Sequence, residues 1–212
     1  MRTQIRIVAG SLRGRKLTCE INSNLRPTPQ MVREALFSIL GDAVPGRPFF
    51  DVFAGTGVVG MEALSRGATS TTFVERDFRL IDDLERHLRE FKLPTGRILR
   101  ADVYRWIERW NPPLEPVNVF LSPPFVDLKG KYEDMLTLID LLQQRLYEGS
   151  VLILQAEKAP LLDSLPLREQ WDVRKYGRNH LLFWVKPLAA NPNPESAAHE
   201  PNRISNNLTS ET

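Results

Sequence analysis

The sequence is poor in the residues that metal centres and disulfide frameworks require. It contains one cysteine, Cys19, and three histidines in 212 residues. No internal disulfide can form, and nothing pairs with the cysteine to suggest a zinc site. Apolar runs long enough to cross a bilayer are missing, and the first ten residues lack the apolar core of a signal peptide. We therefore expect a reduced, cytoplasmic protein that has no metal and contacts no membrane.

The composition is that of an ordinary globular domain with an uneven charge distribution. Hydrophobic residues make up 42% of the chain and charged residues 25%. The net charge is only +2, yet residues 1–33 hold seven arginines and lysines against one acid, Glu20. A basic segment on a mildly acidic body favours a polyanionic partner. On charge alone, a solvated basic face is an equally good interpretation.

The first forty residues predict a hairpin followed by a helix. Two short strand-like runs, residues 4–9 and 14–18, are joined by a GSLR turn sequence. Apolar residues then recur at helical spacing up to residue 40. Thr28 is the expected N-cap of this helix, Pro29 its first residue and Gly41 its stop signal.

From residue 49 the pattern changes to alternating strands and helices. This alternation predicts a mostly parallel sheet with helices on both faces. Two adjacent runs near the C-terminal end predict an antiparallel closing pair. After Pro187 the chain is rich in Asn, Pro, Ser and Glu, which predicts a disordered tail over residues 188–212. The expected strands span residues 49–53, 71–75, 97–101, 117–121, 150–156, 171–177 and 180–186, and the expected helices residues 59–67, 77–91, 103–110 and 132–146.

A glycine-rich loop follows the first of these strands. Gly55, Gly57 and Gly60 form a G-x-G-x-x-G pattern between a strand and a helix, the context that nucleotide-like ligands require. Glu75 ends the next strand, where an acid can accept both hydroxyls of a ribose. Dinucleotides and S-adenosylmethionine both suit this arrangement.

Two further acids favour S-adenosylmethionine over a dinucleotide. Asp51 lies inside the first strand, where a carboxylate would repel a pyrophosphate and attract the ammonium group of a methionine moiety. Asp102 ends the third strand, where its side chain can accept from an adenine amino group. Without these acids, the glycines would indicate only a helix start that needs small residues.

The fourth strand ends on a stiff corner, Ser122-Pro123-Pro124-Phe125. Ligands of open α/β sheets bind just past the carboxyl ends of the strands, so this corner is expected beside the glycine loop. Prolines have no N–H, and the corner therefore offers acceptors and few donors. Ser122 Oγ and the Pro123 carbonyl can hold an exocyclic amine while Phe125 stacks on its ring. The alternative is a plain turn that ends a strand.

Other histidines, aromatic residues and polar residues outside these motifs have either a structural or a functional interpretation. His87 lies on a charged helix and is expected at the surface. Trp106 and Trp110, four residues apart, are expected to pack on the sheet. Glu157 either touches the target base or solvates the sheet edge, and Tyr176, Arg178 and Asn179 are weak candidates for RNA contact.

These motifs resemble the bacterial 16S ribosomal RNA guanine-N2 methyltransferases of the RsmD type. The likeness covers about residues 4–187 and rests on the sequences RIVAGSLRGRKL, RPTPQMVREALFSIL, FDVFAGTGVVGMEALSRGA, FVERD and PPF. It implies a Rossmann-like class I S-adenosylmethionine-dependent methyltransferase, with a seven-stranded, mostly parallel sheet, an antiparallel final strand and an N-terminal β-hairpin/helix extension. The implied division is residues 1–41 for the RNA-binding extension, 42–187 for the methyltransferase domain and 188–212 for the tail.

The resemblance also implies roles for individual residues. The catalytic corner would be Ser122, Pro123, Pro124 and Phe125. The cofactor S-adenosylmethionine would meet Asp51, Gly55, Gly57, Glu75, Asp102 and Thr28. Ribosomal RNA of the small subunit would meet Arg6, Arg13, Arg15, Lys16 and Arg26. Arg33 and Glu34 would order the substrate entrance as an ion pair, in a protein expected to be a monomer.

Ser122 departs from the family, which usually has Asp or Asn before Pro-Pro-Phe. The motif is also similar to that of cytosine-N4 methyltransferases of DNA, which act on exocyclic amines too. Three functions follow for comparison: methylation of a guanine N2 in small-subunit RNA, a catalytically weakened RNA-binding homologue, and methylation of another base amine.

Overall fold

A seven-stranded sheet forms the centre of the protein. The computed structural model describes residues 2–20, 26–157 and 163–189, and orders the strands β5-β4-β3-β6-β7-β9-β8. Strands β3 to β7 run parallel, while β9 pairs antiparallel with both β7 and β8. The predicted sheet and its closing antiparallel pair are confirmed. The strands are β3 (Phe49–Val52), β4 (Thr71–Glu75), β5 (Gly96–Arg100), β6 (Asn118–Leu121), β7 (Val151–Glu157), β8 (Asp172–Tyr176) and β9 (Asn179–Val185).

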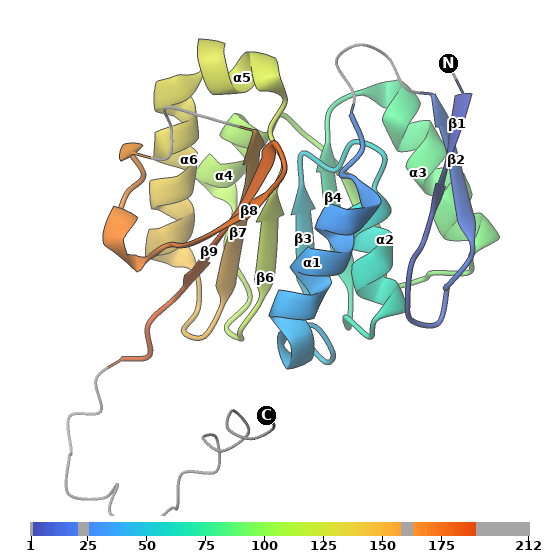
Figure 1. The fold of residues 1–212 in the computed structure, drawn as a ribbon, viewed down its shortest axis with the longest axis horizontal. Coiled ribbons are helices and arrows are strands. Elements are labelled where there is room, and N and C mark those ends of the chain that lie inside the picture. The colour runs from blue at the N-terminus through green and yellow to red at the C-terminus, as the bar shows by residue number, and fades with distance from the viewer. Residues whose placement is uncertain (1, 21–25, 158–162, 190–212) are drawn as a thin grey trace, which may run out of the picture.

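Helices cover both faces of this sheet and create two cores (Figure 1). Side chains alternate along each strand, so Phe49 of β3 joins the core under α1, α2 and α3, whereas Phe50 and Val52 join the core under α4 and α6. Trp106 and Trp110 pack in the second core, as expected. The helices are α1 (Gln30–Leu40), α2 (Val58–Ser65), α3 (Phe78–Glu90), α4 (Val103–Arg109), α5 (Phe125–Gly130) and α6 (Tyr132–Arg145).

The start of α1 differs from its prediction. The N-cap position belongs to Pro29, and the side chain of Thr28 makes no cap hydrogen bond. Thr28 Oγ1 donates instead to Gln155 Oε1 at 2.8 Å, because the segment before α1 lies against the end of β7. Gly41 ends the helix with a φ of 47°, as predicted.

The predicted N-terminal hairpin is present as two antiparallel strands, β1 (Arg2–Arg6) and β2 (Lys16–Glu20), beside α3 (Figure 1). The turn between them binds the C-terminal end of α2. Ser65 Oγ donates to the Ala9 carbonyl and accepts from the Leu12 amide. Gly10 has a φ of 81°, and a Cβ there would lie 1.8 Å from the Ser65 carbonyl oxygen. Only glycine allows this close approach of turn and helix.

His87 fastens the other end of the hairpin, and its expected place at the surface is wrong. Its side chain is buried on α3, and Nε2 accepts from the Thr18 amide at 3.1 Å. This bond requires the neutral imidazole, because a protonated ring has no acceptor. Burial, and then the charge of Arg86, lowers the pKa of His87, while Asp83 and Glu90 act against that shift.

Acid is therefore expected to loosen the hairpin. The pKa of His87 is lower in the folded protein than in the unfolded chain, so the unfolded chain takes up the proton first as the pH falls below about 6.5. This proton contributes a loss of stability of at most about 1.4 kcal/mol per pH unit. Hydrogen exchange should show lower protection factors in β1 and β2 at pH 5 than at pH 7, after correction for the slower intrinsic exchange in acid. His87→Gln, which retains an acceptor, should remove most of the difference; equal sensitivity in this variant would contradict the assignment.

Two further expectations concern the C-terminal tail and membrane-spanning helices. The tail expected at residues 188–212 lies, from residue 190 onward, outside the described residues. Among the helices that the structure does describe, none has the length and apolarity needed to span a membrane.

Candidate active site

A cavity of about 520 Å³ opens where the parallel strands end. It is bordered by the segment before α1, the glycine loop after β3, the ends of β4 and β5, the Ser122–Phe125 corner after β6 and the β7–β9 edge. This volume lies within the usual range for small-molecule sites. The residues expected for a cofactor and for a substrate amine therefore line one cavity, with the exception of Gly57, which is not part of the lining. Its position at the carboxyl ends of the strands is that of ligand sites in open α/β sheets.

The glycine loop is shaped by packing against the sheet and α3. Gly57 begins α2 with a φ of 70°, and a Cβ there would come 2.0 Å from Leu84 Cδ2. A Cβ on Gly60 would lie 2.4 Å from the Phe73 ring. Gly55 has a φ of 56° and donates its amide to Glu75 Oε2 at 2.8 Å. Packing within the protein therefore already requires glycine at positions 57 and 60.

Asp51 is a buried carboxyl directly beneath this loop. Only 1% of the residue is exposed, and its Oδ2 accepts from the Gly60 amide at 2.8 Å. Burial raises the pKa of Asp51 to about 8, with the Gly60 bond acting against that shift and the nearby Glu75 adding to it. A buried acid with this pKa is poorly compensated, and a cation in the cavity would stabilise its charged form. The buried carboxylate therefore fits a ligand that donates from an ammonium group.

Glu75 and Asp102 present two more carboxylates on neighbouring strand ends. Glu75 Oε1 accepts from the amides of Arg76 and Asp77, which holds the side chain at the rim of the cavity. Asp102 caps α4 through the Tyr104 amide, and its other oxygen lies 3.1 Å from Arg76 Nη1. Both acids line the cavity at the ends of these strands.

The Ser122–Phe125 corner is the start of a short helix that the sequence analysis missed. Pro124 is the N-cap residue of α5, and its carbonyl accepts from the amides of Asp127 and Leu128. Asp127 is buried and accepts from the Tyr104 hydroxyl at 3.0 Å, which ties α5 to α4. Burial and this carboxylate raise the pKa of Tyr104 above its usual value, so the hydroxyl remains a donor. The corner is thereby held rigidly against the cavity.

Phe125 presents a partly exposed ring at the mouth of the cavity. It is 39% exposed, and the Arg26 guanidinium lies 5.7 Å from the ring centroid. A planar ligand can stack on this aromatic face, next to a cation that also stacks well on bases.

A chain of side-chain hydrogen bonds forms the wall opposite the glycine loop. Thr28 Oγ1 donates to Gln155 Oε1, and Gln155 Nε2 donates to Asn179 Oδ1 at 3.1 Å. The chain links the segment before α1, the end of β7 and the start of β9. Arg178, Asn179 and Glu157 line the same wall, whereas Tyr176 packs against the core under α1.

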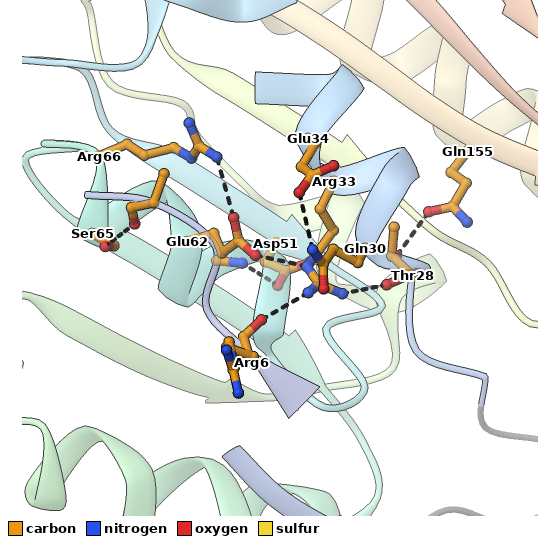
Figure 2. A network of polar contacts seen from close by, with 12 residues as sticks. Arg6, Thr28, Gln30, Arg33, Glu34, Asp51, Glu62, Ser65, Arg66 and Gln155 are labelled. Carbon is orange, nitrogen blue, oxygen red and sulfur yellow. Dashed lines mark hydrogen bonds and ion pairs between the residues drawn. The ribbon is translucent and has the colours of Figure 1, made fainter. Parts of the chain in front are cut away.

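Arg33 is the largest buried cation near the site, and the predicted pair with Glu34 is wrong. Its Nε lies 2.7 Å from Glu62 Oε1, while Nη1 and Nη2 donate to the carbonyls of Thr28 and Arg6 (Figure 2). Glu34 instead accepts from Gln30 on the exposed side of α1. Burial explains the choice, because a guanidinium that is 2% exposed needs a carboxylate that is also buried. Sequence spacing gives no sign of a partner 29 positions away.

The expected RNA-contacting residues fall into two places. Arg26 lines the cavity, whereas Arg6, Arg13, Arg15 and Lys16 are exposed on the hairpin. Arg15 stacks 4.4 Å from the Phe91 ring centroid, and Lys16 donates to Gln4. The hairpin residues do not line the cavity.

The structure adds one strained residue that the sequence analysis did not identify. Phe53, between Asp51 and the glycine loop, lines the cavity with a φ of 63° and packs edge-on against Tyr104. A bulky residue with this φ is costly and is tolerated where the surroundings fix it. Glycine is the residue from which a positive φ is usually predicted. A phenylalanine at position 53 therefore gives no sign of this conformation in the sequence.

The sheet order, the glycine loop and the acids that follow it define a class I S-adenosylmethionine-dependent methyltransferase with a Rossmann-like fold. S-adenosylmethionine is the cofactor of this class. The chain belongs to the family described as Conserved hypothetical protein 95, whose model matches residues 5–185. The predicted RsmD-type family is thereby confirmed.

Comparison with individual proteins agrees with this assignment. The chain is 35% identical over 137 residues to the Escherichia coli ribosomal RNA small subunit methyltransferase D, covering 65% of this chain and 67% of that protein. The solved structure of the putative methyltransferase yhhF from Escherichia coli matches with a TM-score of 0.70 and 29% identity, over 88% of this chain and 100% of that one. The T. thermophilus 16S rRNA N2 G1207 methyltransferase RsmC, solved with AdoMet and guanosine, shares the fold with a TM-score of 0.65 and 23% identity, over 88% of this chain and 50% of that one.

Proposed function

We propose that the protein transfers a methyl group from S-adenosylmethionine to the exocyclic N2 amine of a guanine in 16S ribosomal RNA. One observation carries the proposal: the Ser122–Phe125 corner and the glycine loop with its acids line the same cavity. The relatives named as rRNA small subunit methyltransferases support ribosomal RNA as the substrate. A catalytically weakened homologue is not favoured, since these relatives are named as enzymes.

The cofactor would lie between the glycine loop and the ends of β4 and β5. Asp51 would hold its ammonium group, Glu75 its ribose hydroxyls and Asp102 its adenine, with the backbone at Gly55 and Gly57 close by. Thr28 would act from the opposite wall, where its hydroxyl is bonded to Gln155. S-adenosylmethionine supplies a methyl group on a sulfonium, which needs no further activation.

The corner would position the nucleophile. Ser122 Oγ and the Pro123 carbonyl would accept the two N–H groups of the guanine amine, and Phe125 would stack on the ring. These contacts direct the nitrogen lone pair, which is otherwise delocalised, toward the methyl group. As the N–C bond formed, the bond between the methyl group and the sulfonium sulfur would break and leave neutral S-adenosylhomocysteine, and the nitrogen would give up one proton to water. The base must leave its stack to enter the cavity.

The N-terminal extension would bind RNA without recognising its nucleotide sequence. Residues 1–41 would carry the RNA-binding surface and residues 42–187 the transfer reaction. Arg6, Arg13, Arg15 and Lys16 would contact phosphates, and Arg26 would contact the RNA at the cavity mouth. Such contacts make binding depend strongly on salt.

The function is tested by transfer of tritium from labelled S-adenosylmethionine to undermodified 30S particles, followed by nucleoside mass spectrometry. We expect N2-methylguanosine at one position of 16S RNA. Tight cofactor binding without incorporation into RNA would contradict the proposal, as would a methyl group on an adenine or cytosine amine.

Removing the hydroxyl of Ser122 should slow the reaction without affecting the cofactor. Ser122→Ala leaves one amine N–H without an acceptor, which costs about 1–3 kcal/mol. We expect kcat to fall by about tenfold to a hundredfold while the Kd for S-adenosylmethionine stays within twofold. Single-turnover methylation of 30S particles measures the first quantity and calorimetry the second. A variant with unchanged kcat would show that Ser122 does not hold the amine.

A further inference from the structure

At β7 and β9 the cavity is lined by a hydrogen-bond acceptor, Glu157, and a neighbouring residue with donor groups, Asn179. Glu157 is the last residue of β7 and Asn179 the first of β9, and the two are cross-strand partners. Both are half-buried and line the cavity. The Glu157 carboxylate takes part in no ion pair with the described residues.

The hydrogen-bond chain fixes which end of the Asn179 amide faces the cavity. Gln155 Nε2 donates to Asn179 Oδ1, and Gln155 is itself oriented by the Thr28 hydroxyl. The oxygen of Asn179 is thus engaged, and no described residue accepts from its Nδ2. Glu157 presents a carboxylate to which no described residue donates. The wall therefore offers one donor group, the Asn179 amide nitrogen, beside one acceptor group, the Glu157 carboxylate.

These groups lie on the same face of the sheet as the amine-holding corner. Phe120, Ile153 and Leu181 belong to the core under α1. Because side chains alternate along a strand, Ser122 and Glu157, at even spacing from these residues, share that face with Asn179. Strand order then places the three residues in sequence along the sheet: Ser122 directly after β6, Glu157 on β7 and Asn179 on β9.

We propose that Glu157 and Asn179 select guanine by reading N1–H and O6, the two groups that follow the N2 amine along the edge of the base. The inference rests on the proposed function and names its specificity determinants. The order amine holder, acceptor, donor matches the order N2 amine, N1–H, O6 on guanine. Adenine presents an amine and a bare N1 instead, so its N1 would face the Glu157 carboxylate and its amine the Asn179 N–H groups.

A purine that keeps the methylated amine but reverses the rest of the edge separates this inference from a purely structural role. 2,6-Diaminopurine retains the 2-amine, has an acceptor at N1 and carries an amine at position 6. We expect the wild-type protein to methylate 30S particles reconstituted with this base, at the position mapped by mass spectrometry, at least a hundredfold more slowly than particles with guanine. Similar rates on both bases would overturn the inference.

Exchanging the acceptor and the donor at positions 157 and 179 should weaken the preference for guanine over 2,6-diaminopurine. Asn179→Asp replaces the donor by an acceptor, and Glu157→Gln supplies a donor at the neighbouring position. The single variants should lose at least tenfold in kcat/KM on guanine with the Kd for S-adenosylmethionine unchanged. The double variant should narrow the guanine-to-diaminopurine ratio by at least tenfold. A double variant that keeps the wild-type ratio would overturn the inference.

Matched controls carry the same charge changes outside the cavity. Lys175→Gln on β8 lowers the charge as Asn179→Asp does, and Glu169→Gln raises it as Glu157→Gln does; both residues are exposed. Neither control should alter the ratio. Failure of the proposed function has a different signature, since the wild-type protein would then place no methyl group on a guanine N2 of 16S RNA.

Discussion

Replacing Arg33 by methionine should lower the free energy of unfolding by about 3–5 kcal/mol. The substitution leaves Glu62, which is fully buried, with one ion-pair partner among the described residues, Arg66 Nη2 at 3.4 Å. It also removes the donors from the carbonyls of Thr28 and Arg6. Urea denaturation followed by circular dichroism measures the loss. Hydrogen exchange should show that β1 and the segment before α1 lose protection first, because their attachments are removed.

Arg66→Met is the matched control, since this arginine contacts the same carboxylate but is 22% exposed. We expect it to cost less than about 1 kcal/mol. The double variant Arg33→Met, Glu62→Leu should recover part of the stability lost in the single variant, because no buried charge then remains unpaired. A loss below 1 kcal/mol for Arg33→Met would show that the buried pair does not hold the segments together.

Replacing Asp51 by asparagine should weaken S-adenosylmethionine binding by about thirtyfold to a thousandfold, the effect of removing one partner of a buried charge pair. The amide oxygen can still accept from Gly60, so the loop should keep its shape. Calorimetric titration of the cofactor measures the loss. Asp102→Asn is the matched control, because its carboxyl is partly exposed and already paired with Arg76, and we expect a change below tenfold. A Kd unchanged by Asp51→Asn would remove this residue from the cofactor site.

Because the pKa of Asp51 is raised, cofactor affinity and stability should depend on pH differently in the wild-type protein and in Asp51→Asn. In the wild-type protein the carboxyl is protonated below about pH 8, so cofactor affinity should rise by up to tenfold per pH unit toward that value. Above it, the ligand's own ammonium group loses its proton. The folded pKa lies above the unfolded value of 3.8, so ionisation of Asp51 costs the ligand-free protein stability as pH rises from about 4 to 8. Asp51→Asn should abolish both trends.

The sheet was predictable because local patterns and long-range packing agree along it. Short apolar runs such as residues 117–121 alternate with amphipathic helices, and that alternation admits few topologies. The glycine loop and the Ser122–Phe125 corner follow strands whose ends meet at one edge of a sheet, so their meeting in one cavity could also be expected.

The wrong predictions share one physical cause: burial depends on contacts between residues that are distant in the sequence. His87 has a charged sequence neighbourhood, but the docked hairpin covers it and supplies its donor. Arg33 has an acid beside it in sequence, but its partner lies on another helix. Thr28 has the chemistry of an N-cap, yet β7 provides a competing acceptor. In each case a residue exchanges a local partner for one that only the folded chain supplies.

The attachments of the N-terminal hairpin have a consequence for synthesis on the ribosome. The hairpin emerges before the groups that hold it, Ser65 on α2 and His87 on α3. A two-stranded hairpin alone is marginal in water. We therefore expect the nascent β1 and β2 to remain unpaired until α3 has left the exit tunnel, so that the hairpin gains its structure after elements that follow it in the chain.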